Sequence, residues 1–194
     1  MYIYGASGQG RVVIDMIDST ETIHGVFDDN SSIKEVLGYP VQNAIPSVFN
    51  FRHPFFIAIG DNRIRKKISE QLDGRAKFGT IIHSTAIVSN RCQIHEGTVI
   101  MEGVILKVNC KIGKQVIINT GASVDHDCIL DDFVHLAPQA TLCGDISVGE
   151  GTLIGANALI LPRIKIGAWC KIGAGSVVNK DVPDGATWIG SGMK

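Results

Sequence analysis

An aliphatic residue recurs at every sixth position from Ile82 to Val178, and this repeat constrains the fold more than any other feature of the sequence. An α-helix needs an apolar residue every three or four positions, so a step of six does not follow a helical face. Short β-branched segments separated by Gly and Asn are typical of short strands joined by tight turns. The aliphatic positions are Ile82, Val88, Ile94, Ile100, Leu106, Ile112, Ile118, Val124, Leu130, Leu136, Leu142, Val148, Ile154, Ile160, Ile166, Ile172 and Val178.

This period predicts a parallel β-helix, in which each rung buries its aliphatic side chains against the rung below. Four residues after each aliphatic position stands an uncharged residue that is mostly small or β-branched, such as Ala122 or Cys128. The pattern resembles the hexapeptide repeat of the left-handed β-helix acyltransferases. In that family three hexapeptides form one triangular coil, which implies about five stacked coils here, roughly 4.8 Å apart.

The first part of the chain has a different pattern, and we predict two domains, residues 1–78 and 79–194. Short apolar runs alternate with helical spacing, which is typical of a Rossmann-like α/β half-domain. The predicted order is a strand at Tyr2–Tyr4, a helix at Arg11–Ile17, strands at Gly25–Phe27 and Phe55–Ile59, and a helix at Arg63–Leu72. The predicted fold class is therefore an α/β half-domain followed by an all-β left-handed parallel β-helix.

Composition excludes several classes of function. The formal net charge is −1 without a basic run, so we expect neither nucleic-acid binding nor attraction to an anionic membrane surface. No signal peptide or membrane span is recognisable, which favours a cytoplasmic location. Four of the five cysteines occupy the small interior slot of the repeat, where free buried thiols act as small apolar side chains.

A Gly-rich turn, Gly5-x-x-Gly8-x-Gly10, stands between the first strand and the first helix. Backbone N–H groups and the helix dipole favour an anion there. The spacing departs from the G-x-G-x-x-G of NAD sites, so we prefer a nucleotide-sugar site. Asp28 and Asp29 follow the second strand, at the edge where such sheets bind ligands. A tight turn that only needs glycines, and a cap or solvated turn for the two acids, remain the alternatives.

Two histidines in the repeat are candidates for chemistry. His126 stands two places after an interior aliphatic residue, hence on the outside, and an imidazole can remove a proton at neutral pH. Asp125 or Asp127 could orient it, as a carboxylate does in a triad. Neighbours along a strand point to opposite faces, so this contact does not follow from sequence. His135 is the second candidate, and a surface or structural histidine is the alternative for each.

The whole chain resembles the sugar acyltransferases of the sialic acid acetyltransferase type, and within them the UDP-4-amino-sugar N-acetyltransferases of the bacillosamine pathway. The likeness rests on Y-G-A-S-G-x-G from Tyr4, F-D-D from Phe27, A-I-G-x-N from Ala58, and N-T-x-x-x-x-x-H-D-C from Asn119. It implies that His126 is the general base and that Asp127 orients it. Gln9 departs from the pattern, because relatives have histidine there, close to the sugar.

The resemblance further implies a homotrimer that binds acetyl-CoA between neighbouring β-helices, with each active site shared by two chains and no metal. A backbone N–H near Cys143-Gly144 would stabilise the oxyanion. Arg65 would reach phosphate or be a charge on a helix face. The implied acetyl-CoA-binding residues are Asn119, His135, Cys143, Gly144, Ala156, Ile164, Gly173 and Ala174. The implied nucleotide-sugar-binding residues are Gly8, Gln9, Gly10, Asp28, Asp29, Gly60, Asn62 and Arg65.

The sequence thus predicts an acetyl-CoA-dependent N-acetyltransferase for the 4-amino group of a nucleotide-linked, UDP-type amino-dideoxy sugar used in surface glycan or glycoprotein sugar synthesis. O-acetylation of sialic acid or another sugar hydroxyl is an alternative, because His126 would serve a hydroxyl equally well. In the γ-carbonic anhydrases, two of the three metal-binding histidines are five residues apart. Here His126 and His135 are nine residues apart and Asp131 stands five places after His126, so a metalloenzyme of that type is disfavoured. A non-catalytic β-helix scaffold is the remaining alternative.

Overall fold

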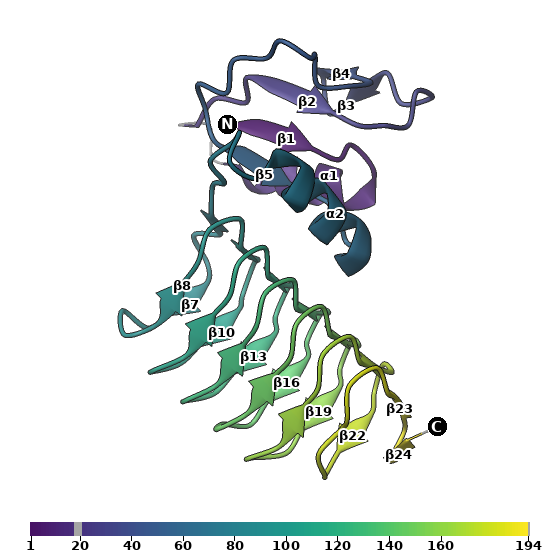
Figure 1. The fold of residues 1–194 in the computed structure, drawn as a ribbon. Helices are drawn as coiled ribbons and strands as arrows, with labels where there is room; N and C mark the ends of the chain where they lie inside the picture. The colour runs from purple at the N-terminus through teal and green to yellow at the C-terminus, as the bar shows by residue number, and fades with distance from the viewer. Residues whose placement is uncertain (18–20, 194) are drawn as a thin grey trace. The chain divides into compact units, whose positions relative to one another are not determined.

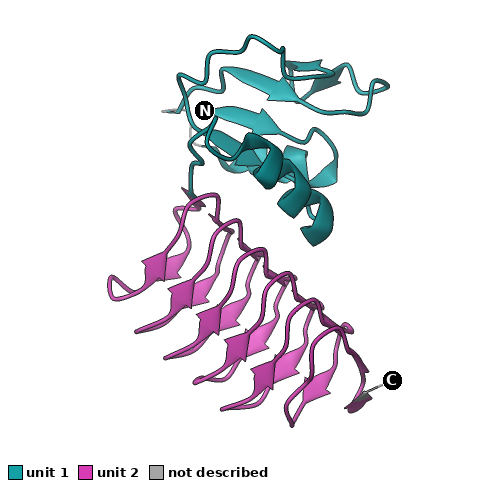
Figure 2. Ribbon diagram, viewed as in Figure 1, with its two compact units in different colours: residues 1–80 teal, residues 81–194 magenta. Residues whose placement is uncertain are grey.

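The structure is a computed structural model that describes residues 1–17 and 21–193. The chain divides into two compact units, residues 1–80 and residues 81–194 (Figure 2). The predicted boundary, between residues 78 and 79, lies two residues before this division. Each unit is described separately below.

Unit 1 is a small, mostly parallel sheet with two helices (Figure 1). The strand order is β3-β4-β2-β1-β5, in which β4, β2, β1 and β5 are parallel and β3 is antiparallel to β4. The carboxyl ends of the parallel strands therefore meet at one edge of the sheet. The elements are β1 (Tyr2–Tyr4), α1 (Gly8–Met16), β2 (Gly25–Phe27), β3 (Glu35–Val36), β4 (Tyr39–Gln42), β5 (Phe55–Ile57) and α2 (Asn62–Leu72).

Two local features of unit 1 differ from the sequence prediction. Helix α1 begins at Gly8 instead of Arg11, so the glycines of the turn form its first turn. Gly10 allows this close approach, because a β-carbon there would overlap the carbonyl oxygen of Gly5. The β3–β4 hairpin was not predicted. It turns at Leu37 and Gly38, which both have positive φ (47° and 83°), the backbone that two-residue hairpin turns require.

Unit 2 is a parallel β-helix in three sheets, whose strands have two residues each except for the three-residue β23, and whose last strand, β24, pairs antiparallel. Sheet 1 contains β6 (Ile81–Ile82), β9 (Val99–Ile100), β12 (Ile117–Ile118), β15 (His135–Leu136), β18 (Leu153–Ile154), β21 (Lys171–Ile172), β23 (Thr187–Ile189) and β24 (Gly192–Met193). Sheet 2 contains β7 (Ile87–Val88), β10 (Ile105–Leu106), β13 (Ser123–Val124), β16 (Thr141–Leu142), β19 (Leu159–Ile160) and β22 (Val177–Val178). Sheet 3 contains β8 (Gln93–Ile94), β11 (Lys111–Ile112), β14 (Ile129–Leu130), β17 (Ser147–Val148) and β20 (Lys165–Ile166).

We call the turns between the sheets corner 1–2, corner 2–3 and corner 3–1. Up to β22, the strands of each sheet pair in register eighteen residues apart, as Leu106 with Val124 and Val124 with Leu142 show. The strands of sheet 2 form one row along the β-helix in Figure 1. Six strands stand in that row, so the stack is slightly taller than the predicted five coils.

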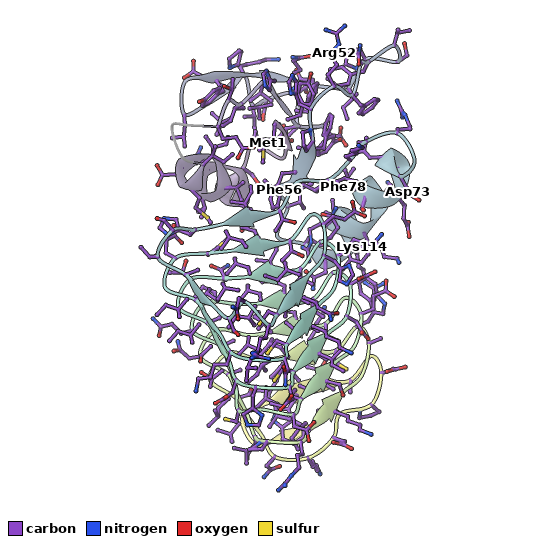
Figure 3. All side chains as sticks on the ribbon, turned by 90° about the vertical axis from the view of Figure 1, so that its left-hand side faces the viewer. Met1, Arg52, Phe56, Asp73, Phe78 and Lys114 are labelled. Atoms are coloured by element: carbon purple, nitrogen blue, oxygen red, sulfur yellow. The ribbon has the colours of Figure 1, made fainter. Side chains whose placement is uncertain are left out.

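The interior of the β-helix is filled by the repeated aliphatic side chains (Figure 3). In the small slot, Cys110 and Cys128 are fully buried, and the buried hydroxyl of Thr152 donates to the carbonyl of Gly167 at 2.7 Å. Trp188 belongs to the same core, and its ring nitrogen donates to the Gly190 carbonyl. The predicted fold class, an α/β unit followed by a parallel β-helix, is confirmed. No helix in the described residues is long and apolar enough to cross a membrane.

Candidate active site

Corner 2–3 of the coil that contains β13 brings His126 and Asp127 together. Strand β13 ends at Val124 and β14 begins at Ile129, so neither residue lies in a strand. Asp127 adopts a left-handed backbone (φ 59°). The alternation of side chains along a strand, which left the contact between His126 and Asp127 uncertain, therefore does not apply here. Nδ1 of His126 lies 2.8 Å from Oδ2 of Asp127. The structure therefore selects Asp127 as the carboxylate that binds the imidazole.

Asp125 holds the backbone of this corner. One of its oxygens accepts the His126 N–H at 2.7 Å, and the other lies 3.3 Å from Nζ of Lys107 in the coil below. The backbone N–H of His126 and the ammonium of Lys107 both lower the pKa of Asp125, so this carboxylate is charged at neutral pH. Asp125 thus fixes the position from which the His126 side chain projects.

His126 is suited to act as a base. Its side chain is 53% exposed, and the hydrogen bond to Asp127 raises its pKa above the ordinary imidazole value, with a smaller contribution from the charges of Asp125 and Asp145. An ionised carboxylate can only accept, so the proton of the neutral ring lies on Nδ1. Nε2 is then the nitrogen that can take a proton.

Gly144 lies against this ring from the next coil. Its φ is 112°, and a β-carbon there would lie 3.0 Å from Nε2 of His126. The Cys143 N–H donates to the Ile160 carbonyl at 3.1 Å, whereas the Gly144 N–H interacts with the buried thiol of Cys128. Of the two predicted oxyanion donors, the Cys143 N–H therefore donates to a backbone carbonyl, and Gly144 is the one beside the imidazole. Burial raises the pKa of the Cys143 thiol.

The residues predicted near the acetyl group lie elsewhere on the coil. His135 lies in β15 of sheet 1, and Asn119 follows β12, its neighbour in that sheet. Nδ2 of Asn119 and Nε2 of His135 are 3.4 Å apart. His126 belongs to corner 2–3 and Asn119 to corner 1–2, with the strands of sheet 2 between them. One chain therefore does not bring His126 and His135 together.

The remaining predicted acetyl-CoA residues divide in the same way. Ala156, Gly173 and Ala174 follow strands of sheet 1, so they stack on corner 1–2 above Asn119. Ile164 belongs to corner 2–3, and its side chain is buried in the β-helix core. Because Ile164 occupies the interior slot of the repeat, its side chain does not face a ligand groove, and the predicted role of the residue in acetyl-CoA binding would fall to its backbone.

Unit 1 has a cavity of about 380 Å³ at the carboxyl ends of β1 and β2. Asp28 does not offer a free carboxylate to it, because its two oxygens accept the N–H groups of Ala6 (2.7 Å) and Asn30 (2.8 Å). Asp29 accepts the Tyr4 hydroxyl on Oδ1 at 2.6 Å. The cavity is lined by Tyr4, Ser7, Asp28, Asp29, Asn30, Ile33, Ile59, Ile64 and Ile68.

Tyr4 and the isoleucines of this cavity were not identified from the sequence. Burial, followed by the hydrogen bond to Asp29, raises the pKa of the Tyr4 phenol, so it remains a neutral donor. A signal was present for Tyr4, since it is the last residue of β1 before the Gly-rich turn. The isoleucines come from separate elements, and no local pattern in the sequence links them.

The Gly-rich turn separates structural from open positions. Gly10 is required by the contact of α1 with β1, whereas an added β-carbon at Gly8 would meet nothing within 4 Å. The hydroxyl of Ser7, the N-cap of α1, caps no backbone N–H. Nε2 of Gln9 is buried and has no acceptor among the described residues. Gly8 and Ser7 are thus available to a ligand, the amide nitrogen of Gln9 is buried, and Gly10 shapes the turn.

Arg65 is placed neither to contact a phosphate nor to present a charge on an exposed helix face. The residue is 1% exposed, and its guanidinium donates to the carbonyls of Ile59 and Gly60 and to the side chain of Asn62. Burial lowers its pKa, partly offset by the charge of Asp61. Arg65, Gly60 and Asn62 therefore form a structural turn between β5 and α2, and the predicted phosphate contact of Arg65 is not supported by this geometry.

No group of three or more His, Cys, Asp or Glu side chains within residues 1–17 and 21–193 could hold a metal ion. The two imidazoles that could have served as ligands, those of His126 and His135, lie on different parts of the coil. Corner 2–3 instead brings together an imidazole, a carboxylate and a glycine of the next coil.

Comparison with known proteins gives matches for both units. Residues 1–72 match the family described as the PglD N-terminal domain, and residues 145–180 match the bacterial transferase hexapeptide repeats. UDP-N-acetylbacillosamine N-acetyltransferase of Bacillus subtilis (strain 168) is 41% identical over 108 residues, which cover 49% of this chain and 48% of that protein. An uncharacterized mimivirus protein is matched over 20% of its length. The chain thus spans about half or less of these curated relatives.

Several solved structures align with the entire chain. The acetyltransferase domain of PglB from Neisseria gonorrhoeae FA1090, in complex with acetyl coenzyme A, has a TM-score of 0.91 at 34% identity, with 97% of that chain covered. A mutant of GDP-perosamine N-acetyl transferase from Caulobacter crescentus, in complex with CoA and GDP-perosamine, has a TM-score of 0.92 at 37% identity, with 94% of that chain covered. The chain therefore belongs to the hexapeptide-repeat sugar acetyltransferases whose β-helix is joined to a PglD N-terminal domain.

Proposed function

We propose that this protein transfers an acetyl group from acetyl-CoA to the amino group of a nucleotide-linked amino sugar. The observation that carries the proposal is the His126–Asp127 pair at an exposed corner of the β-helix, with Gly144 against the ring. The PglB domain that was solved with acetyl-CoA and the perosamine enzyme that was solved with CoA and its nucleotide sugar support it, since both align with the whole chain.

The proposed reaction is a direct transfer. Nε2 of His126 takes a proton from the neutral sugar amine as its nitrogen attacks the thioester carbonyl. The new C–N bond forms while the Gly144 N–H donates to the oxygen that gains negative charge. The C–S bond then breaks, and the proton passes to the departing CoA thiolate. Because both substrates are held together, no covalent enzyme intermediate is required.

We further propose that the cavity of unit 1 binds the nucleotide of the acceptor. Ile33, Ile59 and Ile64 offer apolar walls to a planar base, and Asp29 has one oxygen held by Tyr4 and a second available to a ring N–H or a ribose hydroxyl. The first turn of α1, with Gly8 open and Ser7 uncapped, would face the diphosphate. Gln9 remains our candidate for contact with the sugar.

The proposed acceptor is a UDP-linked 4-amino sugar, in keeping with the similarity to the B. subtilis enzyme. A GDP-linked amino sugar is the second candidate, favoured by the similarity over the whole chain to the perosamine enzyme. The pathway would be that of a surface glycan or glycoprotein sugar. We propose a cytoplasmic location, supported by five free cysteines, which are typical of a reducing compartment.

A homotrimer would complete the site. The outward residues of sheet 2 carry no charge, whereas sheet 3 presents Lys111 and Lys165. If sheet 2 of each chain faces the threefold axis, corner 2–3 of one chain meets corner 1–2 of the next, which would place His126 beside the partner's Asn119 and His135. The outward residues of sheet 2 are Ile87, Ile105, Ser123, Thr141, Leu159 and Val177.

The test is acetyl-CoA consumption, followed by thiol release, against UDP-, GDP- and dTDP-linked amino sugars, with the matching hydroxyl sugars and free sialic acid alongside. We expect turnover with an amino sugar carrying one preferred nucleotide, and an N-acetylated product by mass spectrometry. Turnover restricted to sialic acid or to hydroxyl sugars would replace the proposal with O-acetylation. Binding of neither acetyl-CoA nor a nucleotide sugar would leave only the scaffold alternative.

A further inference from the structure

The carboxylate that binds His126 is itself held by the preceding coil. Nδ2 of Asn109 donates to Oδ1 of Asp127 at 3.1 Å, while Oδ2 of the same carboxylate meets Nδ1 of His126 at 2.8 Å. The two residues occupy equivalent places in successive coils, and both have left-handed backbone, with φ of 62° and 59°. The Asp127 N–H also donates to the carbonyl of Val108 in that coil. Both oxygens of Asp127 are thus engaged, each by a different partner.

We propose that Asn109 is a positioning residue for the reaction, which orients Asp127 so that its second oxygen holds the proton-bearing nitrogen of His126. The proposal rests on the proposed function, because His126 is its base. It adds a third member, from another coil, to the His126–Asp127 pair.

The exposure of the pair explains why such a residue is needed. The side chains of His126 and Asp127 are 53% and 50% exposed, so neighbouring side chains do not lock the carboxylate. An unrestrained Asp127 would rotate and exchange the imidazole for water. A side-chain amide restrains one oxygen without adding charge, so the full negative charge of Asp127 remains to act on His126. The hydrogen bonds from His126 and Asn109 together lower the pKa of Asp127.

A structural explanation competes with this one. Asn is among the few residues that adopt the left-handed region readily, so Asn109 could stand there for its backbone alone. Asn109→Gly separates the two explanations, because Gly keeps the left-handed backbone and removes the amide. Asn109→Asp keeps the shape, removes the donor and adds a second negative charge.

The matched control is Asn157→Gly. Asn157 also has left-handed backbone (φ 55°), its side chain is exposed, and it makes no side-chain hydrogen bond among the described residues. This variant carries the same substitution at a corner without His126. It should retain the His126 titration of the parent protein.

The experiment measures kcat and KM against pH, and follows the His126 imidazole by NMR titration in the full chain without substrates. We expect Asn109→Gly to lower the plateau kcat about tenfold, the value of one hydrogen bond to a charged group, with unchanged KM. The acid limb of its kcat profile and the titration of its His126 imidazole should both move to lower pH. The reason is that the hydrogen bond between His126 and Asp127 is formed in a smaller fraction of the molecules. In Asn109→Asp both should move to higher pH, because a second carboxylate favours the imidazolium.

The proposal is overturned if Asn109→Gly titrates like the parent protein, whether or not its melting temperature falls. It is also overturned if Asn157→Gly shifts the His126 titration as much as Asn109→Gly does. The NMR titration needs no substrate, so failure of the acetyl-transfer proposal with every acceptor remains distinguishable from failure of the positioning proposal.

Discussion

At the scale of single residues, the contact between His126 and Asp127 depends on a backbone detail. The motif Asp125-His126-Asp127 offered two carboxylates, and sequence could not choose between them, because the choice depends on the left-handed φ of Asp127. In the structure Asp125 binds the backbone N–H, and Asp127 binds the ring. The two acids therefore have different roles, one for the main chain and one for the imidazole.

Replacement of Asp127 by Asn tests the second role. If His126 is the base, as we propose, activity falls as pH drops through its pKa, which the hydrogen bond to Asp127 raises. Without the carboxylate this pKa returns toward the ordinary imidazole value. In Asp127→Asn we expect the acid limb of kcat/KM to move to lower pH and the plateau to fall about tenfold or more. A limb that stays in place would show that Asp127 does not act on the base.

Replacement of Tyr4 by Phe tests the cavity of unit 1. The phenol holds one oxygen of Asp29 at 2.6 Å, and its loss frees the carboxylate without changing the ring. We expect KM for the nucleotide sugar to rise about tenfold, with KM for acetyl-CoA unchanged. Initial-rate measurements with each substrate varied in turn provide the check. Equal changes in both constants would contradict a local role of Tyr4 in acceptor binding.

Some residue roles could not be inferred from sequence because they depend on burial. Arg65 had the type and place of a phosphate ligand, yet its guanidinium is buried against the carbonyls of Ile59 and Gly60. Ile164 was expected to line the acetyl-CoA groove, but its side chain occupies an interior slot of the repeat. The phase of the repeat, which the sequence shows, was the signal that could have excluded Ile164.

At the scale of elements, the β-helix could be predicted almost completely because its determinants are local and repeated. Each hexapeptide carries its own aliphatic residue and its own small slot, and the pairing of Leu106 with Val124 follows from the period. The β3–β4 hairpin could not be predicted, because it depends on a positive φ at Leu37, a residue type that rarely adopts it. The start of α1 at Gly8 likewise depends on packing, through Gly10.

Two alanine substitutions in α1 test that packing. A methyl group at Gly10 would overlap the Gly5 carbonyl, so Gly10→Ala should reduce the free energy of unfolding of unit 1 by about 1–3 kcal/mol. Gly8→Ala is the matched change in open space, and it should be neutral or slightly stabilising, since Ala favours a helix. Denaturant unfolding of both variants gives the comparison. Equal stabilities would mean that α1 does not approach β1 as the structure shows.

At the scale of the whole molecule, the division of the predicted site between two corners is the strongest argument for assembly. His126 and Gly144 lie at corner 2–3, whereas Asn119 and the residues stacked above it lie at corner 1–2. Sequence resemblance supplied the residues but not this separation, which follows from the sheet to which each strand belongs. If sheet 2 of each chain faces a common symmetry axis, the residues at corner 2–3 of one chain lie beside those at corner 1–2 of its neighbour.

A charge on sheet 2 tests this assembly. The parent protein should have about three times the 20.8 kDa mass of one chain by sedimentation equilibrium. Ile105→Asp places a carboxylate on the outward face of sheet 2 and should shift the mass toward the monomer and abolish turnover. Gln93→Asp places the same side chain on the outward face of sheet 3 and should leave both unchanged. A parent protein with the mass of one chain would contradict the trimer and the shared site.

The central claim is that His126 is the base for acetyl transfer, and one comparison tests it most directly. Initial rates of thiol release from acetyl-CoA, with the preferred nucleotide amino sugar at saturation, are measured for the parent protein and for His126→Ala. The account predicts a loss of turnover of about 10² or more, with the melting temperature and acetyl-CoA binding retained, because the half-exposed side chain lies outside the β-helix core. A rate near that of the parent protein would contradict it.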